Sequence, residues 1–93
     1  MQVYLGKRGA GMKQKDLKDI GICRNIGMLR SKARMTQEYV AIQMQTMGIK
    51  MSRSRFSMIE LGRERVSVTM LVALKIIFKC SYDDLFEGLE NNL

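Results

Sequence analysis

The sequence predicts an all-α domain built from five helices. From about residue 16 onward, apolar residues recur at steps of three and four, which is the spacing of one face of an α-helix. No stretch alternates apolar and polar residues with the period of two that a half-buried strand requires. Serine or threonine precedes four of the apolar segments, where a side-chain oxygen can accept the unpaired amides of a helix start.

The first three helices are predicted from this spacing and from their caps. We expect the first over residues 16–33, with an inner stripe of Leu17, Ile20, Ile22, Cys23, Ile26, Leu29 and Ala33. The second begins at Thr36 and ends at Gly48, a residue that readily adopts the left-handed backbone of a helix end. The third begins at Ser52, points Phe56 and Ile59 inward, and ends at Gly62.

The last two helices complete the domain. The fourth begins at Ser67 and is apolar nearly all round up to Phe78, so we expect it at the centre of the core. The fifth begins at Ser81, and Asp84 three residues later suggests a capping box. One side of this helix is apolar, through Tyr82, Leu85, Phe86, Leu89 and Leu93. That side is either packed on the core or part of a dimer seam.

Residues 1–15 are predicted to form a basic N-terminal arm outside the domain of residues 16–93. They contain three glycines within six positions and show no sustained periodicity. Four basic residues, Lys7, Arg8, Lys13 and Lys15, lie in this segment. The arm is therefore either disordered or able to follow a polyanion such as DNA into a groove.

Charge is distributed unevenly along the chain. Residues 1–35 carry nine basic and two acidic residues, a balance of +7, whereas residues 66–93 carry two basic and four acidic residues, a balance of −2. A basic surface attracts nucleic acid because each cation near a phosphate releases a counterion. Solvated surface charge is the alternative explanation.

Composition excludes several other classes of protein. The chain has no histidine and only two separated cysteines, Cys23 and Cys80, so we expect no metal and no cofactor. No catalytic cluster is present, which argues against an enzyme. No apolar stretch reaches the length of a membrane span, and two distant cysteines without a second pair favour a cytoplasmic protein.

The third predicted helix has two chemically different sides. Opposite Phe56 and Ile59 lie the small or uncharged residues Ser54, Ser57, Met58 and Leu61, at about 100° per residue. Arginines border this side, namely Arg53, Arg55, Arg63 and Arg65. Small residues let a helix enter a groove, and guanidinium groups hold phosphates or read guanine edges. An ordinary surface helix with scattered arginines would look similar.

In order and spacing, the chain resembles the Xre-type helix-turn-helix regulators, which include the lambda-like phage repressors. The resemblance covers residues 20–86 and is carried by Leu29-Arg30, Thr36-Gln37-Glu38 with Ala41, Ser52-Arg53-Ser54, Ile59-Glu60, Gly62-Arg63, Val66-Ser67, Ala73-Leu74 and Ser81-Tyr82-Asp83-Asp84-Leu85-Phe86. It implies a five-helix lambda-repressor-like DNA-binding domain, here with an elongated second helix and turn.

The resemblance also implies roles for individual residues. Base contacts would come from Arg53, Ser54, Ser57 and Met58. Phosphate contacts would come from Gln37 and Arg63, with Lys50, Arg55 and Arg65 as further cations beside the same helix. Arg30 and Glu60 match a pair that braces the recognition helix and reads no sequence.

Four departures from the family pattern accompany the match. Ten residues separate Ala41 from Ser52, where about five are usual, so the second helix gains a turn before a longer connection over residues 48–51. Arg34 and Lys79 stand where the family prefers glycine for a left-handed backbone. In addition, Leu61 replaces a common polar phosphate contact, and Gly27 replaces a good helix former.

Together these observations predict a sequence-specific, double-stranded DNA-binding transcriptional regulator that acts as a homodimer on an inverted-repeat operator. A single module of this size buries little DNA surface, which is why two are expected. The alternative is an antitoxin or accessory subunit whose main task is to hold a partner protein through its extended second helix and acidic carboxyl end.

Overall fold

The computed structural model describes residues 14–92 and shows an all-α protein, as predicted. Its helices are α1 (Gln14–Lys32), α2 (Gln37–Thr46), α3 (Arg53–Glu60), α4 (Val68–Phe78) and α5 (Tyr82–Leu85), followed by a 3₁₀ turn, η3 (Leu89–Asn92). None of these described residues lies in a strand. None of the described helices is long and apolar enough to cross a membrane.

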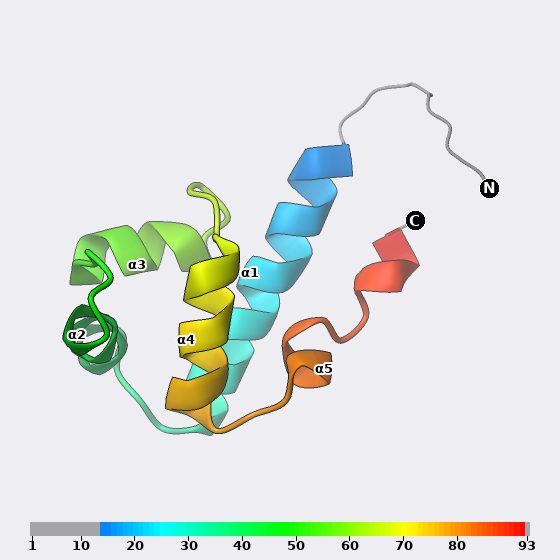
Figure 1. Ribbon diagram of the computed structural model, residues 1–93. Helices are drawn as coiled ribbons and strands as arrows, with labels where there is room; N and C mark the ends of the chain where they lie inside the picture. Colours follow the sequence, from blue (N-terminus) through cyan, green and yellow to red (C-terminus); the bar gives the residue numbers. More distant parts are fainter. Residues whose placement is uncertain (1–13, 93) are drawn as a thin grey trace.

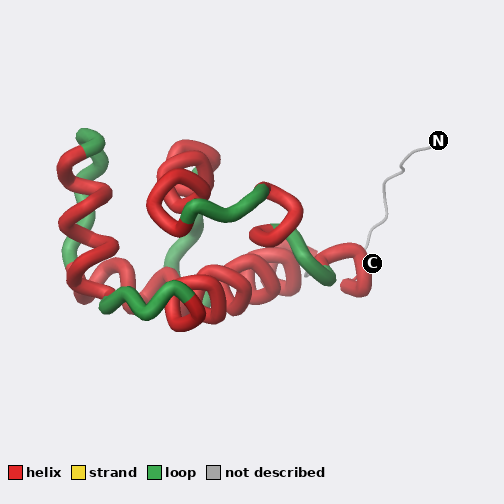
Figure 2. The backbone as a smooth tube through the Cα atoms, turned by 90° about the horizontal axis from the view of Figure 1, so that it is seen from below, coloured by secondary structure: helices red, strands yellow, loops and turns green. Residues whose placement is uncertain are grey.

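Helix α1 is the longest of the described helices, and it contacts α3, α4, α5 and η3 (Figure 1). Helices α2 and α3 lie together at one end, and the segment from α5 to η3 lies at the other. Helix α2 runs across α3, as the views in Figures 1 and 2 agree. The core between the helices is apolar; its largest fully buried side chains are Phe56, Ile26, Met44, Ile59, Leu74, Leu85, Val40 and Cys23.

Four helices start as the sequence predicts, each at a capping hydroxyl. Thr36, Ser52, Ser67 and Ser81 have extended backbones, and each side chain accepts the amide three residues later. At Ser81 the capping box is complete, because the Asp84 carboxylate also accepts the Ser81 amide at 3.0 Å. These caps satisfy amides that have no partner within the helix.

Four helices also end alike, on a residue with a left-handed backbone. After α2 and α3 this residue is a glycine, Gly48 (φ 85°) and Gly62 (φ 76°). After α1 and α4 it is Arg34 (φ 61°) and Lys79 (φ 55°). In each case the amide one residue further on returns to a carbonyl in the last turn, for example Met35 to Arg30 at 3.2 Å. The turns at Arg34 and Lys79 therefore keep the usual geometry without glycine.

The longer connection between the second and third helices is present. Helix α2 runs to Thr46, and the chain passes through Gly48 to reach Ser52. The Ile49 amide donates to the Met44 carbonyl at 3.0 Å, and the Gln45 side-chain amide donates to the Met51 carbonyl at 2.6 Å. The added residues thus form an ordered turn fastened to α2.

The prediction for the first helix needs two corrections. Helix α1 begins at Gln14, two residues before the expected start, so the predicted arm of residues 1–15 overlaps it; the arm's first thirteen residues lie outside the described residues. Ile20 was expected in the inner stripe, yet it is 47% exposed. Ile22, Cys23 and Ile26 are buried as expected.

The prediction of a single fifth helix from Ser81 to Leu93 was wrong. Helix α5 ends at Leu85, and Gly88, with φ 77°, separates it from η3. The Asn25 side chain on α1 donates to the Leu85 carbonyl at 2.7 Å and to the Glu87 carbonyl at 2.9 Å. A side chain distant in sequence thus takes carbonyls that a continuing helix would have used.

The expectation for the fourth helix was also wrong in part. Helix α4 buries Met70, Ala73, Leu74, Ile77 and Phe78, but it exposes a second apolar stripe. Because its neighbours cover one side only, this helix borders the core instead of lying at its centre.

Candidate nucleic-acid interface

Helix α3 is anchored on one side and open on the other. Phe56 and Ile59 are fully buried against the core. On the opposite side Ser54 is exposed, Ser57 is half-buried, and Met58 and Leu61 are 38% and 62% exposed. The side that carries the predicted base contacts therefore faces away from the globule. It is uncharged and made of small or flexible side chains.

The structure brings Arg30 and Glu60 together as an ion pair that ties α3 to α1. Arg30 Nε donates to Glu60 Oε2 at 2.6 Å, and Arg30 Nη2 donates to Glu60 Oε1 at 3.2 Å. Arg30 Nη1 also donates to the Met35 carbonyl at 2.8 Å, which fastens the turn before α2. The two charged side chains are only 20% and 11% exposed, so water screens the pair weakly.

Gln37 joins the same group. Its Nε2 atom donates to Glu60 Oε1 at 3.0 Å, so the predicted phosphate contact also supports the end of α3. The sequence did not indicate this hydrogen bond, because Gln37 and Glu60 are 23 positions apart and helical periodicity relates only residues within one helix. Gly27 lies beside the same carboxylate: a Cβ there would be 3.5 Å from Glu60 Oε1.

Arg55 braces the other part of α3. Its guanidinium forms an ion pair with Glu64 in the loop after α3 and donates to the Lys50 carbonyl, before α3, at 2.8 Å. Arg55 was predicted as a phosphate contact, whereas its described contacts are within the chain. Glu64 was missed by the sequence reasoning, since nothing in the spacing pairs it with Arg55.

The remaining predicted cations are differently placed. Arg53 at the start of α3, Lys50 before it, and Arg63 and Arg65 after it are all exposed. Within the described part of the chain, none of these four side chains forms an ion pair. Their charges are therefore available at both ends of the outward side of α3.

A surface hollow lies between the start of α2 and the start of α3. It is lined by Arg30, Thr36, Gln37, Glu38 and Arg53. The first amides of a helix lack acceptors within the helix and favour an anion, and Arg53 adds positive charge. Glu38 opposes that charge. A phosphate group at this position would meet Gln37 and Arg53 together.

Among the residues that the structure describes, the two groups with shifted pKa values lie near α5 and not at α3. Hydrogen bonds from the backbone and the hydroxyl of Ser81 lower the pKa of Asp84 below its ordinary value. Burial raises the pKa of the Cys80 thiol. Among the described residues, no three His, Cys, Asp or Glu side chains cluster in a way that could hold a metal ion.

In comparisons with models of protein families, with curated proteins and with solved structures, this chain has no significant match.

Proposed function

We propose that this protein is a sequence-specific, double-stranded DNA-binding transcriptional regulator with a lambda-repressor-like arrangement of its five helices. The observation that carries the proposal is the outward side of α3, where Ser54 and Met58 are exposed and Ser57 is half-buried while Phe56 and Ile59 anchor the helix. A helix held in this way can enter the major groove with its backbone close to the bases.

The side chains on this helix supply two kinds of contact. Arg53 pairs with a guanine edge, Ser54 and Ser57 hydrogen-bond to bases, and Met58 packs against a thymine methyl group. Lys50, Arg63 and Arg65 hold the flanking phosphates, and Gln37 meets a phosphate at the start of α2. Arg55 supports α3 from within, because its guanidinium already binds Glu64 and the Lys50 carbonyl.

Two copies of this module act together on an inverted repeat. One helix of eight residues covers few base pairs, so adequate specificity requires a second module about one turn of DNA away. Binding of such a dimer at a promoter either blocks polymerase or recruits it.

Selection of bound duplexes from a random pool tests the proposal. We expect enrichment of a two-fold symmetric site, and affinity that falls steeply as salt rises. A duplex affinity that does not change with salt, or a pool without enrichment, would contradict it.

Arg53→Ala then tests the assignment of the helix. It should weaken binding to the selected site by about 10- to 100-fold, and binding to random duplex much less. Arg24→Ala is the matched control, because Arg24 is an exposed arginine on α1. An equal loss on both duplexes would make Arg53 a phosphate contact. If Arg53→Ala and Arg24→Ala weakened binding to the selected site equally, the result would contradict the assignment of α3 as the DNA-binding helix.

A further inference from the structure

Helix α4 exposes apolar side chains where a surface helix usually carries polar ones. Val68, Val72 and Ile76 are 77%, 40% and 57% exposed. They follow one another at steps of four, so they lie on one side of the helix, opposite its buried residues. Neither the core nor α3 uses this stripe, and it was not foreseen from the sequence.

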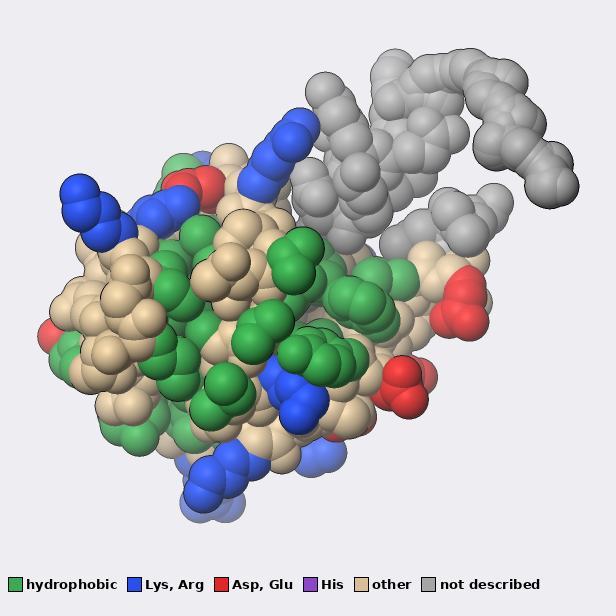
Figure 3. All heavy atoms as spheres, viewed as in Figure 1, with side chains coloured by type: hydrophobic (Ala, Val, Ile, Leu, Met, Phe, Trp, Pro, Cys, Tyr) green, Lys and Arg blue, Asp and Glu red, His purple; other side chains and the backbone are tan. Residues whose placement is uncertain are grey.

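The stripe continues onto α5. Tyr82 and Phe86 are 43% and 45% exposed, and the ammonium group of Lys75 on α4 lies 5.3 Å from the centre of the Tyr82 ring. Figure 3 shows hydrophobic side chains gathered over α4 and toward α5 on one face of the molecule. We call the surface formed by Val68, Val72, Ile76, Tyr82 and Phe86 the α4–α5 face. A contiguous exposed apolar surface of this kind often marks a binding surface.

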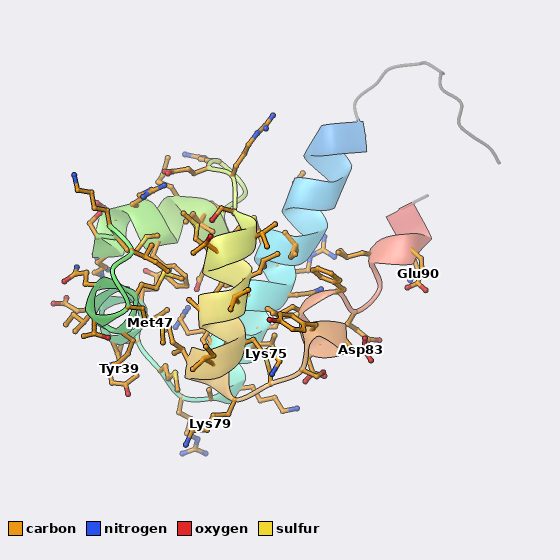
Figure 4. All side chains as sticks on the ribbon, in the orientation of Figure 1. Tyr39, Met47, Lys75, Lys79, Asp83 and Glu90 are labelled. Atoms are coloured by element: carbon orange, nitrogen blue, oxygen red, sulfur yellow. The ribbon has the colours of Figure 1, made fainter. Side chains whose placement is uncertain are left out.

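Charges of both signs lie within and around this face. Lys75 extends from the carboxyl-terminal half of α4 and Lys79 from the turn that follows it, whereas Asp83 and Glu90 extend from the segment after that turn (Figure 4). Acidic side chains lie along one edge of the apolar area in Figure 3, and basic ones lie at another. A surface with an apolar centre and both signs of charge at its border complements a copy of itself across a two-fold axis.

We propose that the α4–α5 face binds the same face of a second copy of this chain. The carboxylates of Asp83 and Glu90 oppose nucleic acid or an anionic bilayer at one edge, whereas a second copy can pair them with its own Lys75 and Lys79. The inference rests on the proposed function only for what the dimer does, which is to bind an inverted repeat. The α4–α5 face does not include α3, so a dimer formed through this face leaves α3 exposed.

Sedimentation equilibrium of the full chain without DNA tests whether the protein dimerises through the α4–α5 face. We expect a reversible dimer for the unaltered protein and a dimer weakened at least about 100-fold in the double variant Val72→Glu/Ile76→Glu, because like charges then meet in an apolar contact. Met28→Glu is the matched control: Met28 is an apolar side chain on α1 that is 63% exposed. Circular dichroism and the urea midpoint show that each variant remains folded.

Cross-linking gives an independent measurement of position. Val72→Cys should form a disulfide-linked dimer under mild oxidation, and Met28→Cys should not. The inference is overturned if the unaltered protein stays monomeric, if the double glutamate variant dimerises as the unaltered protein does, or if Met28→Glu weakens the dimer equally. A monomer that instead captures vesicles through this face would also overturn it.

Binding to a single half-site separates this inference from the proposed function. The double glutamate variant should bind one half-site with unaltered affinity while losing the gain that a full inverted repeat provides. If no duplex binds, but the glutamates still abolish the dimer, the proposed function fails and the α4–α5 face stands as the dimer surface.

Discussion

Gln37 Nε2 lies 3.0 Å from Glu60 Oε1, so the first residue of α2 donates a hydrogen bond to the last residue of α3. Arg30 on α1 binds both oxygens of the same carboxylate. Three helices therefore meet at one side chain that is 11% exposed. The position of α3 on the globule depends on this polar group as well as on the burial of Phe56 and Ile59.

Replacing Glu60 should destabilise the fold strongly. Glu60→Ala leaves the poorly exposed Arg30 without its acceptor, and we expect a loss of about 2–3 kcal/mol in the free energy of unfolding. Urea denaturation followed by circular dichroism measures it. Glu64→Ala is the matched control, since that side chain is 37% exposed and its pair with Arg55 is worth less than about 1 kcal/mol. Equal losses in the two variants would contradict the role given to Glu60.

Glycine at position 34 should stabilise the protein. Arg34 has φ 61°, a conformation that costs side-chain-bearing residues energy and that glycine adopts freely. Arg34→Gly should therefore raise the free energy of unfolding by roughly 0.5–1 kcal/mol. Lys32→Gly, two residues earlier and inside α1, should lower it by about 1 kcal/mol. Thermal denaturation that gives both changes the same sign would show that the turn is not left-handed in solution.

Alanine at position 27 should also stabilise the protein, because glycine inside a helix costs conformational entropy. A Cβ at this position would lie 3.5 Å from Glu60 Oε1 and 3.7 Å from its carboxyl carbon, both ordinary contacts. We expect Gly27→Ala to gain about 0.5–1 kcal/mol in urea denaturation. Gly27→Leu should instead lose stability, since the longer side chain must displace the Glu60 carboxylate. A loss with alanine would mean that the carboxylate cannot accept this contact.

Acid should weaken the start of α5. The pKa of Asp84 is lowered from 3.8, so its carboxylate stabilises the folded state at neutral pH, and that contribution is lost as pH falls through the lowered pKa. The stability difference between the unaltered protein and Asp84→Asn should thus stay constant above about pH 5 and shrink as pH falls below the ordinary pKa of 3.8.

Titration of the Asp84 carboxyl group by NMR identifies the cause of that shift. Ser81→Ala should raise the pKa of Asp84 only part of the way, because the hydroxyl is lost and the backbone amide remains. Ser67→Ala, which removes the equivalent cap of α4, should leave the pKa of Asp84 unchanged. A full return to the ordinary value in Ser81→Ala would assign the whole shift to the hydroxyl.

The local features of this fold could be predicted from the sequence. Thr36, Ser52, Ser67 and Ser81 were expected to begin helices and do so, because a cap acts within three residues of its own position. Gly48 was expected to end α2, and it adopts the left-handed conformation there. The burial of Phe56 and Ile59 on α3 was likewise predicted from the helical spacing of these two apolar residues.

The features that depend on distant contacts could not be predicted. The break after Leu85 requires Asn25, which is sixty residues away in the chain. The exposed stripe of α4 depends on which helices pack beside it, and an apolar helix carries no signal that one of its sides is uncovered. At the candidate site, the outward residues were identified from the sequence, but the use of Arg55 and Gln37 within the chain was not.

The division of α3 into two sides has a consequence for inheritance. Under the proposed function, substitutions at Ser54 or Met58 would change the recognised sequence without disturbing Phe56 and Ile59, which keep the helix packed on the core. The outward side of α3 can therefore vary one residue at a time in descendants of this gene, while the cost in folding stays low.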